Sequence, residues 1–314
     1  MSRVVLLGFV AAGMLTGLAA PCKAQAPVSL IRKLPENSAF ATATRQKVMQ
    51  TMMVAGMKQD TSSEQTAVVR TRIGKRAADG SISVNTDFKQ LQMQLKIPTL
   101  GDVTFDSVNP DKATDSPLTP LLKAISSMAW TSTYDKNNVV TAVAGHDKAL
   151  ESLDAALRDG VKKRYEPDYL RATANDSLDR IPSKPTKPGE SWVQTTTTRL
   201  DSAQSLTFTK KYTYRGVVES DGKTVDRIDV VTTAVKLEIE GGPGVPIKLI
   251  KSDLKIGKSN GTLLFDRQLG RVISETETNQ IKGPITLGVG EQEFPAEIDL
   301  TIETEAIERP SLLN

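Results

Sequence analysis

Stretches in which apolar and polar residues alternate one by one recur along this 314-residue chain, and they constrain its fold more than any other feature. In residues 90–96, Leu and Met occupy every second position between Gln and Lys, and residues 235–240 and 298–303 alternate in the same way. Successive side chains of a strand point to opposite faces, so this pattern is typical of strands with one buried and one solvated face. Short turns containing Gly and Asp separate the stretches, which indicates antiparallel pairing.

The alternation predicts strands along both halves of the chain. In the second half, residues 206–217 alternate only if the pair Lys210-Lys211 breaks the register or shifts face, and the loop Gly241–Gly244 separates two strands. The predicted strands are Ala39–Met53, Gln65–Arg76, Ser81–Lys96, 206–217, 225–240, Leu254–Phe265, Arg271–Ile281 and Glu293–Ile307.

In three segments of the first half, apolar residues recur with the period of a helix instead of alternating. Leu and Ile recur at spacings of three and four in Pro117–Trp130, which predicts a helix with one apolar stripe. A second helix is expected over Asp147–Arg158, with Gly160 placed to end it, and a third over Asp168–Arg180.

The tract Ile181–Glu190 contains three prolines within seven residues and cannot continue a helix, so it is the expected boundary between the halves. We therefore divide the chain into a leader at 1–24, a strand-rich first half with helices at 25–180, and an antiparallel second half at 181–314. The predicted fold class is mainly β (α+β), with two related halves of curved antiparallel sheet and two or three short helices in the first half.

A short sequence pattern occurs in both halves of the chain. Tyr134-Asp135-Lys136 and Phe265-Asp266-Arg267 each place an aromatic residue before an Asp that can bond a turn backbone through its side chain. Two readings stay open: unrelated hairpins that use the same turn chemistry, or duplication of a β unit.

The first 26 residues predict a secretory signal peptide. Arg3 precedes an uncharged apolar run, Val4–Ala20, and a short polar segment follows. We favour cleavage after Ala24 over cleavage after Ala26, because Pro27 would follow the second bond directly. The mature protein is then expected in the periplasm or outside the cell, without a membrane span.

Two alternatives to soluble export remain at this leader. Lipidation at Cys22 would require a small residue before it, and Pro21 occupies that position. An uncleaved membrane anchor would use Val4–Ala20, which is short for a span.

Composition excludes several kinds of chemistry. One Cys and one His cannot form an internal disulfide or a zinc site with the usual ligands, so no metal and no cofactor is expected. A formal net charge of only +3 spread over the chain does not indicate a nucleic-acid binder.

The candidate chemical groups each have a plain structural interpretation. His146 stands at the predicted start of a helix, no Gly-x-Ser-x-Gly motif presents a nucleophile to it, and Gly257-Lys258-Ser259 lacks the remainder of a phosphate loop. The basic cluster Lys162–Tyr165 suits a solvated helix end or an anionic-lipid contact. Three pairs of carboxylates lie two residues apart, as on any solvated strand: Glu238 with Glu240, Glu275 with Glu277, and Glu303 with Glu305. No catalytic residue is predicted, and the ligand-binding residues are left unassigned.

A family resemblance rests on a few motifs of the second half. Ile181-Pro182, Lys187-Pro188-Gly189 with Trp192, and Phe265-Asp266 resemble those of a family of exported bacterial proteins of unknown function. The resemblance implies a β-rich second half after the Pro-Gly-x-x-Trp motif and a Phe-Asp hairpin, but no activity. More distantly, the layout resembles the lipid- and lipoprotein-carrier folds of the bacterial envelope.

The function expected from these observations is binding rather than catalysis. The ligand would be an apolar molecule held between sheet and helices, or another envelope component. The helices Pro117–Trp130 and Asp147–Arg158 either leave a groove over the sheet or simply close the core. A structural or assembly protein of the envelope is the second hypothesis, and a carboxylate-based hydrolase is the third.

Overall fold

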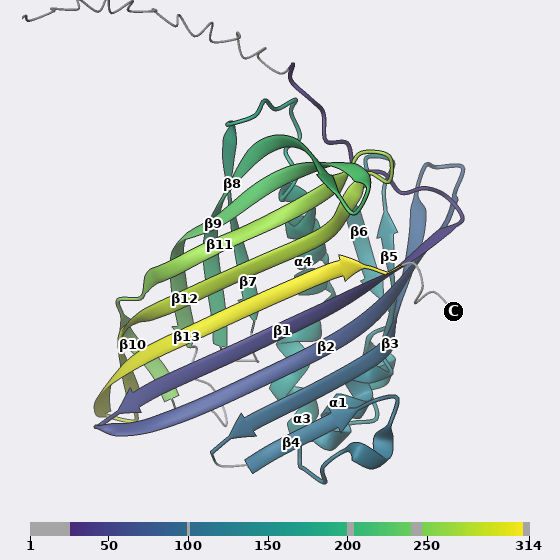
Figure 1. The fold of residues 1–314 in the computed structure, drawn as a ribbon. Helices are drawn as coiled ribbons and strands as arrows, with labels where there is room; N and C mark the ends of the chain where they lie inside the picture. Colours follow the sequence, from purple (N-terminus) through teal and green to yellow (C-terminus); the bar gives the residue numbers. More distant parts are fainter. Residues whose placement is uncertain (1–25, 99–100, 200–203, 240–246, 310–314) are drawn as a thin grey trace, which may run out of the picture.

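Antiparallel strands make up most of the chain in the computed structural model, which describes residues 26–98, 101–199, 204–239 and 247–309 (Figure 1). The strands are β1 Ser38–Val54, β2 Met57–Arg76, β3 Ile82–Ile97, β4 Gly101–Asp106, β5 Ala129–Tyr134, β6 Val140–Ala144, β7 Ser191–Arg199, β8 Gln204–Ser220, β9 Lys223–Ile239, β10 Ile247–Ser252, β11 Lys255–Asp266, β12 Arg271–Val289 and β13 Gln292–Glu308.

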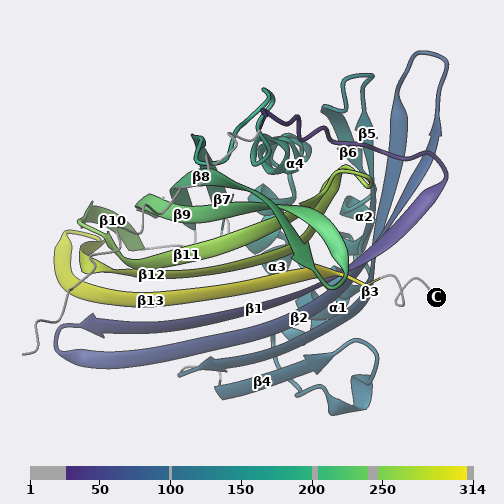
Figure 2. The same ribbon diagram turned by 45° about the horizontal axis from the view of Figure 1, so that its top comes forward.

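All these strands belong to one curved sheet (Figures 1 and 2). Its order is β6-β5-β3-β2-β1-β13-β12-β11-β9-β8-β7, with β4 paired to β3 and β10 to β12. The pairing of β1 with β13 joins the two parts of the chain, so strands from both sides of residues 181–190 share one sheet. The predicted fold class, a mainly β chain with a curved antiparallel sheet and short helices in the first half, is confirmed. The division at residue 181 stays a prediction.

Strand β2 begins earlier than its sequence predicts. It starts at Met57 rather than Gln65, because Ala55 and Gly56 form a two-residue turn with positive φ angles of 49° and 81°. Residues 57–64 carry few apolar side chains, so no alternation reveals this part of the strand. Its pairing with β1 is decided by the turn and by the neighbouring strand.

The helices are short and lie on one side of the sheet, behind it in Figure 1. They are η1 Pro110–Lys112, α1 Thr119–Ser126, α2 Asp147–Leu150, α3 Ala155–Val161, η2 Lys162–Tyr165 and α4 Pro167–Asp179. The third predicted helix is confirmed as α4. The first is shorter than expected, because β5 begins at Ala129.

The predicted continuous helix Asp147–Arg158 is wrong. The chain leaves α2 after Leu150 and begins α3 at Ala155, where the Asp154 carboxylate accepts a hydrogen bond from the Leu157 backbone N–H at 2.9 Å. An Asp at this position caps a helix start and so competes with helix continuation. Two short helices replace the one predicted helix, and Gly160, which was expected to end it, lies within α3.

Helix α4 contacts both ends of the sheet, β6 and β7. Its Asn175 side chain accepts a hydrogen bond from the Val140 N–H at 2.9 Å and donates one to the Val140 carbonyl at 3.0 Å. On the other side, Gln194 of β7 donates to the carbonyl of Asp176. The helix therefore satisfies backbone groups that an edge strand would otherwise expose.

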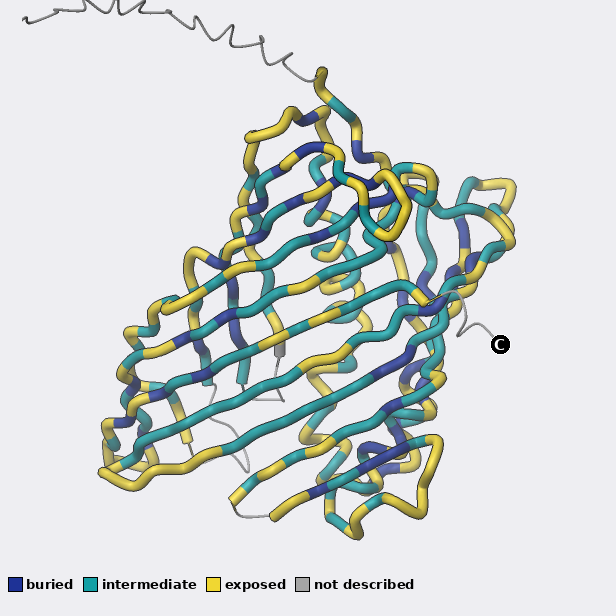
Figure 3. Tube along the Cα trace, in the orientation of Figure 1, coloured by how far each residue is buried: buried dark blue, intermediate teal, exposed yellow. Residues whose placement is uncertain are grey.

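The sheet has little covering over its centre. Strand β1 has neighbours on both sides, yet only Ala41 among its 17 residues is buried (Figure 3). The largest buried side chains instead gather between β8, β9 and β11, around Tyr212, Tyr214 and Phe265, and a second apolar cluster lies around Ile281 and Leu300. Smaller clusters lie under the helices.

The structure differs from the predicted pattern in where the register shift beside Lys210 lies. The register between β8 and β9 does shift beside it, but the extra residue lies on β9, and Lys210 stays on the inner face with Phe208 and Tyr212. There its ammonium group lies 2.7 Å from the Glu277 carboxylate, with both side chains at most 18% exposed. The charge stays inside because it has a partner.

The two turns that contain this repeated pattern are stabilised by the same kind of hydrogen bond, from backbone N–H groups to an Asp carboxylate. The Asp135 carboxylate accepts hydrogen bonds from the N–H groups of Asn137 and Val139, at 2.8 and 2.9 Å. Asp266 accepts from Gln268 and Leu269 at 2.8 and 3.0 Å. Both aspartates are turn residues, as their sequence context predicts.

Candidate functional site

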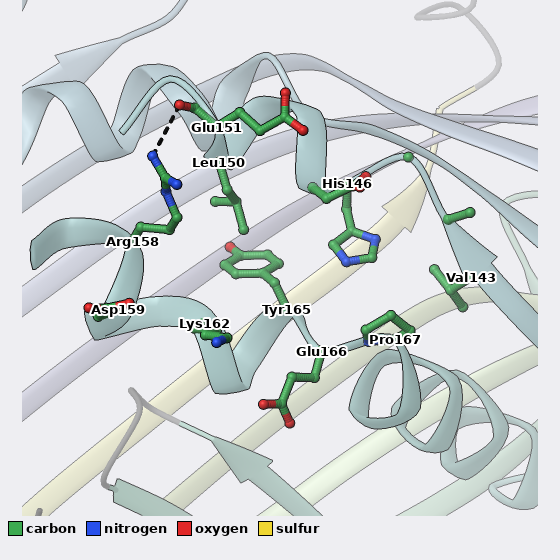
Figure 4. Close-up of a pocket in the computed structure, with 13 residues that line it drawn as sticks. Val143, His146, Leu150, Glu151, Arg158, Asp159, Lys162, Tyr165, Glu166 and Pro167 are labelled. Carbon is green, nitrogen blue, oxygen red and sulfur yellow. Dashed lines mark hydrogen bonds between the residues drawn. The ribbon is translucent and has the colours of Figure 1, made fainter. Parts of the chain in front are cut away.

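Two adjoining hollows lie where β5 and β6 meet the helices. We call the first the outer cleft; it measures about 550 Å³ and is drawn in Figure 4. We call the second the inner chamber; it measures about 360 Å³ and lies between β5, β6 and α4. Val143, His146 and Tyr165 line both hollows, so these three residues mark the boundary between them.

The position of His146 follows from the residue before it. Gly145 has a φ of +97°, and a Cβ there would lie 3.3 Å from the Ala129 carbonyl oxygen, so the tight turn from β6 into α2 favours glycine. His146 then stands at the N-terminal cap of α2, as predicted. Its imidazole, however, makes no capping hydrogen bond and extends toward the hollows (Figure 4).

The imidazole is buried without a partner for one of its nitrogens. His146 is 4% exposed, and Nδ1 has no hydrogen-bond partner among the described residues. A buried polar group of this kind costs free energy unless something satisfies it. The sequence-based interpretation of His146 as only a helix-start residue is therefore incomplete.

The inner chamber is apolar and partly aromatic. Phe88 and Trp130 meet at 6.0 Å between ring centres in a tilted arrangement, and Met128 and Leu170 add further apolar surface. Its remaining described lining residues are Ser132, Val143, His146, Tyr165, Thr173, Ala174 and Ser177. None of these lining residues is Asp, Glu, Lys or Arg.

Tyr165 separates the chamber from the cleft. It ends η2, and in Figure 4 its ring lies below Leu150 and to the left of His146. Burial raises the pKa of its hydroxyl, so the side chain stays neutral at pH 7. The predicted basic cluster Lys162–Tyr165 thus contributes its aromatic member to the site, while Lys163 and Arg164 are exposed.

The outer cleft carries charges of both signs. Asp147, Glu151, Asp159 and Glu166 line it together with Arg158 and Lys162. The Arg158 guanidinium donates to the carbonyls of Glu151 and Leu153, at 3.3 and 2.7 Å, and so holds α3 against the chain that leaves α2. These charged side chains line the outer cleft and not the inner chamber.

The paired carboxylates noted in the sequence do not converge on this site. Glu275 lies 2.7 Å from Arg180 and Glu277 lies 2.7 Å from Lys210, which balances both charges on the inner face of the sheet. On β13, Glu303 and Glu305 stand opposite Lys47 and Arg45 of β1. Glu238 pairs with Lys236 at 2.5 Å. Glu240 lies outside the described residues.

The structure also shows where the other candidate groups noted in the sequence lie. Gly257-Lys258-Ser259 lies within strand β11, away from any helix start. In the described part of the chain, no three His, Cys, Asp or Glu residues are grouped so that they could hold a metal ion. Within the same ranges, none of the helices is long and apolar enough to cross a membrane. The leader and Cys22 lie outside the described residues.

Sequence reasoning did not find the chamber, because its walls come from distant segments. Phe88 lies on β3, Trp130 on β5 and Leu170 on α4, and only the sheet order brings them together. One signal was available: His146 is the chain's only histidine and follows a glycine in a helix-start pattern. That signal does not reveal which neighbours surround the imidazole.

Solved structures that match this chain do so at low identity and with low TM-scores. One is DynF from the dynemicin biosynthesis pathway of Micromonospora chersina, at 9% identity, covering 90% of this chain and 85% of that one with a TM-score of 0.21. Another is an outer membrane channel from Pseudomonas putida F1, at 7% identity, with coverages of 91% and 100% and a TM-score of 0.26. A DUF1329 family protein from Desulfovibrio piger has 7% identity, coverages of 82% and 83%, and a TM-score of 0.12.

Family membership is better defined than these structural likenesses. No curated protein matches the chain. A family model does match, over residues 79–271, which include β3, the helices, the chamber walls and the Phe265-Asp266 hairpin. The chain belongs to DUF6263, a family of unknown function.

Proposed function

We propose that this protein is an exported, non-enzymatic binding protein of the bacterial envelope, and that it holds a small apolar ligand in the inner chamber. The observation that carries the proposal is the chamber itself, an apolar and aromatic hollow of about 360 Å³ between sheet and helices. Ligand sites are commonly hollows of roughly 300–1,000 Å³ with apolar walls and a few polar groups. Ser132, Thr173 and His146 are such polar groups here.

The surroundings of His146 support binding over catalysis. Hydrolases that use a histidine orient it with a carboxylate and bond it to a nucleophile. Among the described residues, His146 Nδ1 has neither partner, and the carboxylates Glu275 and Glu277 are neutralised elsewhere by Arg180 and Lys210. The inner chamber offers apolar and aromatic surface for binding.

Export is supported by the sequence of residues 1–26, with a charge-free apolar run and small residues at the expected cleavage positions. A periplasmic or extracellular protein meets apolar compounds in water, where an apolar chamber has a clear use.

The chain carries its own reporter of chamber occupancy. Trp130 lines the chamber, whereas Trp192, the second tryptophan, stacks on Tyr212 at 5.7 Å in another part of the fold. Trp192→Phe keeps an aromatic ring there and leaves Trp130 as the single tryptophan. We expect decalin, a small apolar probe, to produce a saturable change in Trp130 fluorescence in this variant.

A matched pair of substitutions on α4 tests where the ligand binds. Ala174 lines the chamber and Ala172 is exposed two residues away. In the Trp192→Phe background, Ala174→Phe should strongly weaken binding because its ring takes up part of the chamber, and Ala172→Phe should leave binding unchanged. The proposal is wrong if no saturable signal is seen, or if Ala174→Phe binds as well as Ala172→Phe.

A further inference from the structure

Two β-bulges align four lysines along strands β10 and β11. The register against β12 shifts between Leu249 and Lys251, and again between Ile256 and Lys258. Each shift adds one residue to the bulged strand, so side chains three residues apart reach the same face of the sheet instead of opposite faces. The four lysines, which we call the lysine row, are Lys248, Lys251, Lys255 and Lys258; they stand opposite Gly288, Thr286, Lys282 and Gln280 of β12.

The lysine row lies on the outer face of the sheet, away from the core. Ile281 and Ile285 of β12 alternate with the residues that oppose the lysines, and both are buried in the apolar cluster around Ile281 and Leu300. All four lysines are exposed. Their ammonium groups are therefore accessible to a partner in solution.

Most of the charge in the lysine row is not neutralised within the protein. In the described part of the chain, Lys248, Lys251 and Lys258 form no ion pair. The ammonium group of Lys255 lies 3.8 Å from the Asp253 carboxylate, and these side chains are 77% and 61% exposed, so water weakens their attraction.

The lysine row follows a free edge of the sheet. Strand β9 pairs with β11 only through residues 226–230 and 261–265, and no described strand pairs with β10 or with residues 255–260 on that side. On the other side of β12, the outer face of β13 carries the carboxylates of Glu293 and Glu297. The positive charge therefore lies at the edge, and Figure 2 shows β10 at the end of the sheet away from the helices.

One of the bulges also adds an apolar side chain to the lysine row. Ile250 is the extra residue of its bulge and is 43% exposed. A Cβ at Gly288 would lie 2.9 Å from Ile250 Cδ1 and 3.0 Å from Lys248 Cε, so the two side chains lie together over this glycine. A bilayer surface offers anionic head groups and apolar chains together, which a soluble polyanion does not.

We propose that the lysine row docks this protein, edge first, on a membrane surface that contains anionic phospholipids. The inference goes beyond the proposed function, because it concerns the outer face of the sheet and not the inner chamber. Clusters of four or more lysines bind such membranes through the negative surface potential, which extends over about one Debye length, roughly 8 Å at 0.15 M salt. An exported protein of the envelope would meet such a surface.

Cosedimentation with vesicles tests the proposal. The chain without its leader is mixed at pH 7 with vesicles of phosphatidylcholine, either alone or with about 30% phosphatidylglycerol, at about 0.05 M and 0.5 M NaCl. We expect the protein to bind the anionic vesicles at least about tenfold more tightly than the neutral ones at low salt, and to lose most of this preference at high salt.

Two triple variants with the same change in net charge locate the contact. A lysine beside an anionic membrane strengthens binding by about fivefold, so replacing Lys248, Lys251 and Lys258 by Gln should weaken binding about 100-fold. The matched control replaces three exposed lysines of the helices by Gln and should change binding by less than about threefold. The control lysines are Lys112, Lys123 and Lys148.

A single substitution separates a bilayer from a soluble polyanion. Ile250→Ser should weaken binding to the anionic vesicles by about threefold, because the exposed part of its apolar surface no longer enters the bilayer boundary. Binding of soluble polyglutamate by the same variant should equal that of the unmodified protein. Far-ultraviolet dichroism and thermal unfolding check that every variant folds.

Three results would overturn the inference. If the unmodified protein does not bind anionic vesicles, or if the two triple variants lose binding equally, the lysines and bulges only protect the free edge from pairing with another strand. If polyglutamate binds as tightly as the vesicles and Ile250→Ser changes neither, the lysine row is a general polyanion site. The proposed chamber is tested separately by Trp130 fluorescence without vesicles, so the two proposals fail independently.

Discussion

Asp226 on β9 offers the sharpest test of how the sheet is stabilised. The residue is 1% exposed, and its carboxylate accepts hydrogen bonds from the Tyr214 hydroxyl at 2.6 Å and from Nε and Nη2 of Arg267, both at 2.5 Å. Asp226→Asn removes the negative charge and replaces one accepting oxygen with a donating amide. A donor would then face the donors of Arg267 inside the core.

The cost follows from the burial of each partner. Removing one member of a buried ion pair costs about 3–5 kcal/mol, and hydrogen bonds to charged groups contribute about 1.5–3 kcal/mol. The Arg267 side chain is 40% exposed and can recover part of its hydration from water. We therefore expect Asp226→Asn to lower the free energy of unfolding by about 2–4 kcal/mol.

Urea unfolding at pH 7, followed by far-ultraviolet dichroism, measures this change. Asp229→Asn is the matched control: Asp229 lies on the same strand, pairs with Arg215 and Arg227, and has a side chain that is 24% exposed. Exposed pairs contribute about 0–1 kcal/mol, so the control should lose no more than that. Equal losses in the two variants would show that burial of the Asp226 pair does not determine its contribution.

Three further predictions concern pH, the sheet edge and processing. Burial, followed by the hydrogen bond to Asp226, raises the pKa of Tyr214 from 10.0 to about 12, so the stability this group contributes below pH 10 should be lost as the pH rises from 10 to 12. Tyr214→Phe should reduce that alkaline loss in urea titrations. Asn175→Ala removes both hydrogen bonds to Val140 and should lower stability by about 1–3 kcal/mol and speed hydrogen exchange of the Val140 amide. Mature protein from its host should begin at Gln25 or Pro27 by intact mass, and an acylated Cys22 or a start at Met1 would contradict this.

The sequence by itself determined the strands that carry a clear alternation. Residues 90–96 and 298–303 lie in β3 and β13 as predicted, because one solvated and one buried face leave a mark at every second position. The turn aspartates Asp135 and Asp266 were also predictable, since their hydrogen bonds reach only two to four residues along the chain. Local chemistry was enough for these features.

Tertiary structure decided the remaining features. The polar start of β2 at Met57 is a strand because β1 pairs with it, and Lys210 stays on an inner face because Glu277 is there to meet its charge. The chamber exists because β3, β5 and β6 are neighbours in the sheet and α4 packs against β6. Contacts between residues far apart in the chain depend on the order of strands in the sheet, and no pattern of neighbouring residues encodes that order.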